Sequence, residues 1–169
     1  NWQEIYALAE AHNVTAVITS QIKKLPQGSR PQGKLLSAFN QRLGYTVQNY
    51  EIKMRAMTHL IEVLSQAEID HLLVKGAVLR FLYPSPELRT SGDTDVVVRL
   101  SDYEKSVKVL KKAGFKVDFV RKNVSQVVYG GEFFDLHTEL ESINVQSKIY
   151  YSTPFDDISE STGHTYKLK

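Results

Sequence analysis

Residues 92–95 read Gly-Asp-Thr-Asp and stand directly before an apolar run at 96–98. Side chains alternate between the two faces of a β-strand, so Asp93 and Asp95 are expected to point to the same side of a sheet. Carboxylate oxygens are the ligands that Mg²⁺ prefers in proteins. The spacing therefore predicts a divalent-cation site, although the same residues would also suit a turn that holds no metal.

A third acid lies in residues 132–140, which we predict to be a strand. Its seven central residues divide between two faces: Phe133, Asp135, His137 and Glu139 on one, and Phe134, Leu136 and Thr138 on the other. A strand that only builds a core is normally apolar in its middle, whereas this one carries Asp135 there. We therefore expect Asp135 to join the site and take His137 as a further candidate. The alternatives are a solvated aspartate on an edge strand and a structural histidine.

A turn of small residues, Lys75-Gly76-Ala77, separates a predicted strand at 72–74 from a short predicted helix at 77–83. A glycine there lets the backbone approach an anion at a helix amino terminus, where amide groups and the helix dipole favour negative charge. Lys75 and Arg89 are candidates for phosphate contacts because of their charge. Arg89 would alternatively pair with Glu87, and we expect Arg80 to lie on the surface.

The segment before residue 68 is predicted to be helical. Short amphipathic helices are expected at 2–9 and 14–22, followed by a loop at 25–33 that contains two prolines and two glycines. From 34 to 67 apolar residues step by three or four, which predicts one helix on the order of 50 Å long. Residues 1–67 are therefore expected to form a helical region.

The remainder, residues 68–169, is predicted to be an α/β (α+β) core. Ser101 and Glu104 form a candidate capping box for a helix that Gly114 ends. The Gly130-Gly131 pair predicts a hairpin turn. The expected strands are 72–74, 95–100, 115–120, 126–129 and 132–140. The pattern does not decide whether residues 143–151 are helical or whether residues 166–168 begin a strand.

Composition narrows the class of protein. The chain has 169 residues, of which 42% are hydrophobic and 24% are charged, as in ordinary globular proteins. Its net charge of +2 is too small to indicate nucleic-acid binding, and the lack of cysteine excludes disulfides and thiolate metal sites. No apolar run is long enough to span a bilayer and no signal pattern opens the chain, so we expect a cytoplasmic protein with no membrane partner. The chain begins with Asn rather than Met, and its last residues show no end signal. We therefore expect a fragment that is truncated at the carboxyl end.

The order of these features resembles a known superfamily. A strand, a small-residue turn, a helix, an Asp-x-Asp strand and a later strand with a third Asp are similar to the nucleotidyltransferases that include DNA polymerase beta, the poly(A) polymerases and antibiotic-modifying enzymes. More narrowly, the chain resembles a bacterial family of uncharacterised nucleotidyltransferases, which also has a helical amino-terminal region. The matching residues are Leu73-Val74-Lys75-Gly76, Leu79, Tyr83-Pro84, Arg89, Gly92-Asp93-Thr94-Asp95 and Asp135-Leu136-His137, and the resemblance covers about residues 1 to 140.

This resemblance implies a mixed β-sheet that is flanked by helices. It also implies a nucleotidyltransferase activity. A nucleoside monophosphate would pass from a nucleoside triphosphate to an unknown acceptor (a small molecule, RNA or protein), with Mg²⁺ or Mn²⁺ bound and pyrophosphate released. Asp93, Asp95 and Asp135 would be the catalytic and metal-binding residues, and Asp135 would also orient or deprotonate the acceptor hydroxyl. The nucleotide would contact Lys75, Gly76, Ala77, Arg89 and Gly92.

The turn departs from the wider superfamily pattern. Most members read Gly-Gly-Ser or Gly-Ser, whereas this chain reads Lys75-Gly76-Ala77, a form that the narrower family shares. Two other functions therefore stay open. One is a module on the same fold that binds a nucleotide or a partner without turnover. The other is a toxin-like enzyme that modifies tRNA or protein, for which the lysines at 105, 108, 111 and 112 are the support.

Overall fold

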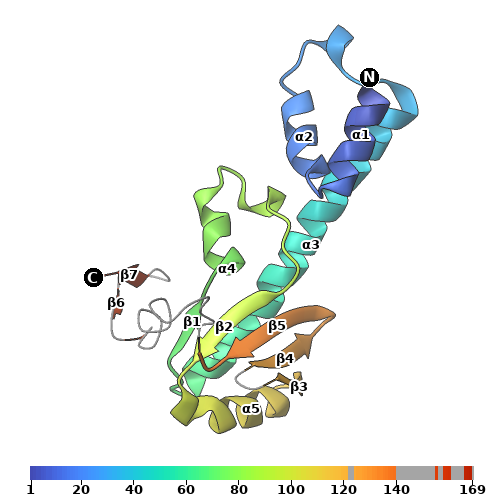
Figure 1. Ribbon diagram of the computed structural model, residues 1–169. Helices are drawn as coiled ribbons and strands as arrows, with labels where there is room; N and C mark the ends of the chain where they lie inside the picture. The colour runs from blue at the N-terminus through green and yellow to red at the C-terminus, as the bar shows by residue number, and fades with distance from the viewer. Residues whose placement is uncertain (122–123, 140–154, 156–157, 161–165, 169) are drawn as a thin grey trace.

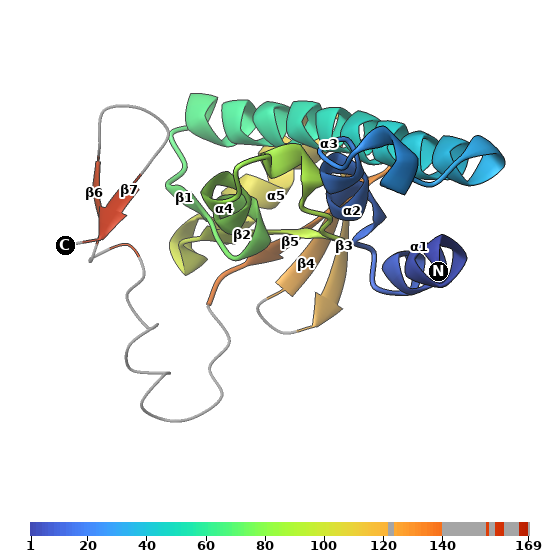
Figure 2. The same cartoon turned by 90° about the horizontal axis from the view of Figure 1, so that it is seen from above.

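The computed structural model describes residues 1–121, 124–139, 155, 158–160 and 166–168 (Figure 1). Three helices form the amino-terminal part: α1 (Trp2–Ala11), α2 (Thr15–Ile22) and α3 (Gly33–Gln66), with a 3₁₀ turn at Gln27–Ser29. The 34 residues of α3 confirm the predicted long helix. One end of α3 carries α1 and α2 and the other end lies along the sheet, as Figures 1 and 2 show.

The helical end has its own small core around Phe39, which is fully buried. Trp2 and Tyr6 of α1 meet the Phe39 ring edge-on, at centroid distances of 6.1 and 4.9 Å. Trp2 Nε1 also donates to the backbone oxygen of Ser29, 3.1 Å away, which holds the proline-rich loop against α1. These contacts fix α1 and the loop on α3.

The sheet has five strands in the order β1-β2-β5-β4-β3. Its members are β1 (His71–Leu73), β2 (Thr94–Val98), β3 (Lys116–Arg121), β4 (Val124–Tyr129) and β5 (Glu132–His137). The β2–β5 pair is parallel and the other pairs are antiparallel. The predicted hairpin at Gly130-Gly131 is confirmed, since both glycines have positive φ and join β4 to β5. A mixed sheet flanked by helices is therefore confirmed.

One face of the sheet forms the main core. Val96 and Val98 of β2 and Phe134 and Leu136 of β5 pack there against the buried apolar stripe of α3. The helix α5 (Tyr103–Lys112) covers the same face, where its Leu110 is fully buried. The alternate residues, including Asp95 of β2 and Asp135 of β5, therefore lie on the opposite face. The fold thus separates an apolar face from a polar one.

The predicted capping box of α5 is wrong. Ser101 lies inside a 3₁₀ turn, Leu100–Asp102, so Asp102 occupies the N-cap position and makes no side-chain capping bond. The predicted stop is confirmed, because Gly114 adopts a φ of 92° directly after the helix. Because of the 3₁₀ turn, α5 begins one residue later than predicted. Ser101 therefore no longer occupies the N-cap position that a capping box requires.

The described part of the tail contains two short antiparallel strands, β6 (Ile158–Glu160) and β7 (Tyr166–Leu168). Residues 166–168, which the sequence left open, form a strand, whereas residues 143–151 lie outside the described residues. Among the described helices, none combines the length and the apolar character that a membrane span requires.

Candidate active site

The parallel pairing of β2 with β5 brings three side chains together on the polar face. Asp95 stands opposite Asp135 in the register, and His137 follows two residues later on the same side. One ligand atom from each of these three residues lies within 4.8 Å of the others. Asp95 is 7% exposed and His137 4%, so two of the three are removed from solvent. The face shared by Asp135 and His137 agrees with the alternation expected from the sequence.

Asp95 is the most connected member of this cluster. Its Oδ1 accepts a hydrogen bond from Lys75 Nζ and lies 2.9 Å from Nε2 of His137. A carboxylate so close to Nε2 favours the proton on that nitrogen. The other ring nitrogen, Nδ1, is buried with no hydrogen-bond partner among the described residues. His137 therefore orients Asp95.

Asp93 lies beside the cluster but outside it. It is exposed, directly before the first residue of β2, and does not belong to the group that meets within 4.8 Å. Its charge nevertheless acts on the cluster. Burial raises the pKa of the Asp135 carboxyl above its usual range, and the negative charge of Asp93 raises that pKa further. Three acids thus gather at one end of the parallel strands, with Asp93 on the solvent side.

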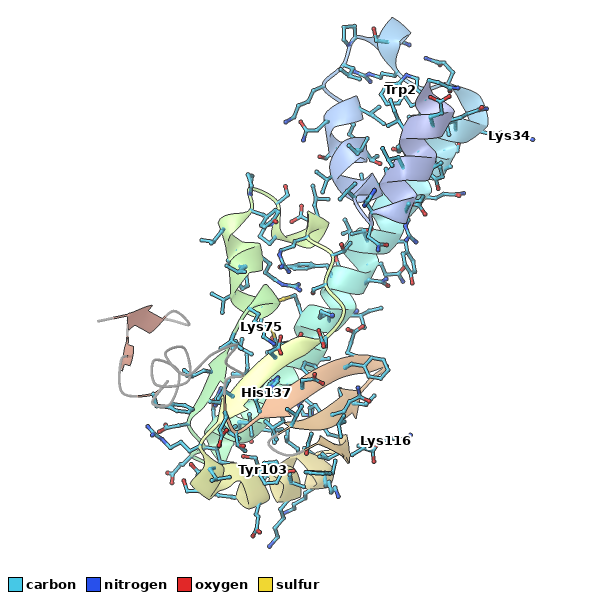
Figure 3. All side chains as sticks on the ribbon, viewed as in Figure 1. Trp2, Lys34, Lys75, Tyr103, Lys116 and His137 are labelled. Atoms are coloured by element: carbon cyan, nitrogen blue, oxygen red, sulfur yellow. The ribbon has the colours of Figure 1, made fainter. Side chains whose placement is uncertain are left out.

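The Lys75-Gly76-Ala77 turn borders the cluster because Val74 donates its N–H to the backbone oxygen of Asp95, 3.2 Å away. Lys75 has φ 52° and ψ −120°, a conformation that only glycine adopts without strain. The strained backbone directs its side chain to Asp95, and Figure 3 shows Lys75 and His137 close together beside β2. Gly76 then begins the short helix α4 (Gly76–Leu79).

Arg89 lies at this turn rather than at Glu87. Its Nη1 approaches the backbone oxygen of Gly76 at 3.5 Å, and its guanidinium lies 5.9 Å from the centre of the Tyr83 ring. A Cβ added to Gly76 would come within 3.0 Å of the same Nη1 atom. The small residue at position 76 therefore makes room for Arg89.

Ala77 and Gly92 take different positions. Ala77 is buried in the main core, so only its backbone is placed to meet a ligand at the turn. Gly92 is exposed beside Asp93, and its backbone oxygen accepts a hydrogen bond from Lys53 of α3. The segment before β2 is therefore tied to the long helix.

The expectation that Arg80 lies on the surface is wrong. Arg80 is only 2% exposed; its Nη2 donates to Ser91 Oγ at 2.6 Å and its guanidinium lies 5.5 Å from the centre of the Tyr50 ring. It begins a 3₁₀ turn, Arg80–Leu82, in which Arg80 is buried while Phe81 and Leu82 are exposed. The burial comes from contacts with residues distant in the sequence, which a local pattern does not report.

Lys53 is a buried cation that the sequence reasoning missed. It is 8% exposed, donates to the backbone oxygens of Ser91 (2.9 Å) and Gly92, and lies 3.6 Å from a carboxylate oxygen of Glu132. A signal was present, because Lys53 stands on the apolar stripe of α3, three residues after Tyr50 and four before Met57. A lysine at an inward position of a helix indicates a polar neighbour in the fold.

Comparison with known proteins shows the family of this chain. The model of the uncharacterised nucleotidyltransferase family matches residues 1–167. The chain belongs to that family. The family expected from the sequence is therefore confirmed, and with it the transferase class. No curated protein sequence matches this nucleotidyltransferase.

Among solved structures, the antibiotic-resistance factor ANT(2'')-Ia, determined in solution, is similar to this nucleotidyltransferase. The sequence identity is 10% and the TM-score is 0.48. The similarity covers 70% of this chain and 61% of ANT(2'')-Ia, so the chain spans less than two thirds of that protein's length.

The donor atoms of this nucleotidyltransferase suit a divalent cation. Asp95 and Asp135 offer carboxylate oxygens, and Asp93 stands beside them on the solvent side. His137 supports this set by holding Asp95 through Nε2. In the structure the ammonium group of Lys75 neutralises Asp95, so the polar face is already adapted to a positive charge at that oxygen. These donor atoms therefore fit the divalent metal ion that the family implies.

Proposed function

We propose that this chain transfers a nucleoside monophosphate from a nucleoside triphosphate to a hydroxyl group of an acceptor. The observation that carries the proposal is the meeting of Asp95, Asp135 and His137 on one face, next to the Lys75-Gly76 turn. In the reaction the acceptor oxygen forms a bond to the α-phosphorus. The bond from that phosphorus to the bridging oxygen breaks, and pyrophosphate leaves with the electron pair. The hydroxyl proton passes to a base.

Asp93, Asp95 and Asp135 are proposed to hold Mg²⁺ or Mn²⁺. When bound, the ion neutralises phosphate charge and polarises the phosphorus–oxygen bonds. Asp93 is exposed and so is free to meet an incoming nucleotide, whereas Asp95 is buried and held by His137. The two carboxylates of the Asp-x-Asp pair thus have different freedom to move.

Asp135 is proposed as the base that accepts the hydroxyl proton. Burial raises the pKa of its carboxyl, and the negative charges of Asp93 and Asp95 act in the same direction. A carboxylate with a raised pKa is a stronger base than an ordinary aspartate. Asp135 is also only half-buried and stands opposite Asp95 in the register of β2 and β5.

Lys75, Gly76, Ala77, Arg89 and Gly92 are proposed to bind the triphosphate. The side chain of Lys75 is 63% exposed and can leave Asp95 for a phosphate oxygen when a metal ion replaces its charge. Within the described part of the chain, Arg89 donates one long hydrogen bond, to Gly76, so most of its donors remain available. In place of the serine hydroxyl of the wider superfamily, the chain would use these two cations.

A second candidate is a nucleotide-binding module without turnover. It is favoured by Ala77, whose buried methyl group supplies no hydroxyl at the position where the wider superfamily uses one. Release of pyrophosphate distinguishes the two functions. We expect Mg²⁺-dependent release from at least one triphosphate when hydroxyl-bearing acceptors are supplied, and none from the variant Asp93→Asn/Asp95→Asn. Binding of a triphosphate without release over a broad acceptor panel would favour the module.

A further inference from the structure

A cavity of about 420 Å³ lies between the helical region and the sheet. Its walls come from α2, α3, the 87–92 segment and the start of β5; residues that matter here are Arg42, Asn49, Lys53, Arg80, Arg89 and Glu132. Gly92 also lines it, so the cavity begins next to Asp93. At the helical end Thr90 donates its hydroxyl to the backbone oxygen of Asn13, 3.2 Å away, and so joins the two regions.

The floor of this cavity carries two buried cations. Lys53 and Arg80 are 8% and 2% exposed, and both line the cavity. Burial lowers the pKa of each, and the charge of Arg80 lowers the pKa of Lys53 further although Glu132 opposes it. Two desolvated cations that repel one another cost stability unless an anion compensates them.

The carboxylates of the described residues compensate these cations only in part. Arg42 pairs with Glu10 at 3.2 Å and Lys53 with Glu132 at 3.6 Å. Within the described ranges, Arg80 has no carboxylate oxygen within 4.0 Å. Arg89 also lines the cavity, but it is assigned above to the triphosphate. A buried guanidinium without a carboxylate, facing a cavity, is the arrangement that binds carboxylate or phosphate ligands.

We propose that this cavity binds the acceptor, and that the acceptor is a small molecule with a phosphate or carboxylate group near the hydroxyl that is modified. A volume of about 420 Å³ suits a small molecule rather than an RNA or a protein segment. The lining includes Gly92, which precedes Asp93, and Phe133, which stands two residues before Asp135 on the same face of β5, so an acceptor in the cavity lies toward the proposed base. The assignment of this ligand as the acceptor rests on the proposed function, whereas anion binding in the cavity does not depend on it.

The test is calorimetric titration of the whole chain with inorganic phosphate, glycerol 3-phosphate and citrate, with glycerol as the uncharged control. We expect at least one anion to bind and glycerol not to bind. Asn49→Asp adds a negative charge to the cavity wall and is expected to weaken binding about tenfold or more. The matched control is Gln48→Glu, an equal change of charge at the exposed neighbouring position of α3, which should leave binding within about twofold.

Two further titrations separate the cavity from the metal site. The variant Asp93→Asn/Asp95→Asn should retain anion binding, so loss of transfer in that variant with binding intact supports both proposals. If the parent binds the anion but releases pyrophosphate from none of the triphosphates, the proposed function fails and the cavity site stands. If Asp93→Asn/Asp95→Asn still transfers nucleotide, the assignment of these two acids fails instead. Each Mg²⁺–triphosphate should bind equally well when the cavity is saturated with the anion. No anion binding, equal binding in Asn49→Asp, or competition with the triphosphate would overturn the acceptor site.

Discussion

His137 Nε2 lies 2.9 Å from Asp95 Oδ1, across the parallel strands β2 and β5. The contact joins a buried imidazole to a buried carboxylate and fixes the direction of the Asp95 oxygens. It arises because the parallel register places Val97 opposite His137 and Asp95 opposite Asp135, so that the histidine reaches diagonally to Asp95. The sheet itself thus orients the central acid of the proposed site.

Replacing His137 by Asn should weaken Mn²⁺ binding and nucleotide transfer by about 10- to 100-fold, because a ligand's orienting partner is lost. The measurements are the Mn²⁺ dissociation constant and kcat. The control is His59→Asn, since His59 stacks on Phe115 at a centroid distance of 5.3 Å in the main core. That control should lower thermal stability with Mn²⁺ affinity unchanged. Equal Mn²⁺ affinity in His137→Asn and the parent would contradict the orienting role.

The pKa of Asp135 predicts a dependence of stability on pH. Because burial raises the pKa of this carboxyl in the folded chain, its ionisation destabilises the fold. Below the pKa of Asp135 in the unfolded chain, the carboxyl is protonated in both states and the fold keeps its full stability. As pH rises through the higher pKa of the folded chain, the carboxyl ionises and this stability is lost. Asp135→Asn should therefore have a higher Tm than the parent at about pH 7 and a similar Tm at about pH 3.5.

The same comparison with Mn²⁺ added provides the check on the metal. Mn²⁺ should raise the Tm of the parent at about pH 7 and raise that of Asp135→Asn much less, because bound ligand stabilises only a chain that binds it. A Tm difference between parent and variant that does not change with pH would refute the assigned direction of the pKa shift.

The strained backbone of Lys75 leads to a prediction for two variants. Both Lys75→Gly and Lys75→Met remove the ammonium group, but only glycine adopts φ 52°, ψ −120° without strain. Lys75→Gly should therefore exceed Lys75→Met in free energy of unfolding by about 1 to 3 kcal/mol, measured in urea. Both variants should bind triphosphate more weakly than the parent. Equal stability of the two variants would show that Lys75 is not strained.

Gly76→Ala should impair nucleotide binding more than it impairs folding. The new Cβ would meet Arg89 Nη1 at 3.0 Å, and that atom is the end of a flexible side chain that can move away. We expect a stability change of about 1 kcal/mol or less and a clear rise in the triphosphate dissociation constant. Gly44→Ala in α3 is the control, because a Cβ there meets nothing within 4 Å. It should leave nucleotide binding unchanged and raise stability by up to about 1 kcal/mol.

The sequence predicted those features that depend on local periodicity. The stripe of α3 ran from Leu35 to Leu64 without interruption, and the Gly130-Gly131 pair admits few structures other than a turn. The alternation in β5 placed Asp135 and His137 on one face because a strand leaves no other choice. Such patterns act within one element and are therefore visible before folding.

The features that the sequence did not predict depend on contacts between elements. Arg80 is buried by Ser91 and by Tyr50, which is thirty residues earlier, and neither contact has a sequence pattern. The role of His137 likewise depends on strand order, since only the parallel pairing of β5 with β2 brings it to Asp95. The same pairing leaves Asp93 at the edge of the cluster, although its spacing from Asp95 made both acids look equivalent.

The most direct test of the account is titration of the chain with each of the four nucleoside triphosphates in Mg²⁺. The parent should bind at least one of them only when the metal is present. Asp93→Asn/Asp95→Asn should lose this binding, whereas Asp70→Asn/Asp118→Asn, an equal change of charge at exposed positions, should retain it. Undiminished Mg²⁺-dependent binding in Asp93→Asn/Asp95→Asn would contradict the assignment of these carboxylates as the metal and nucleotide site.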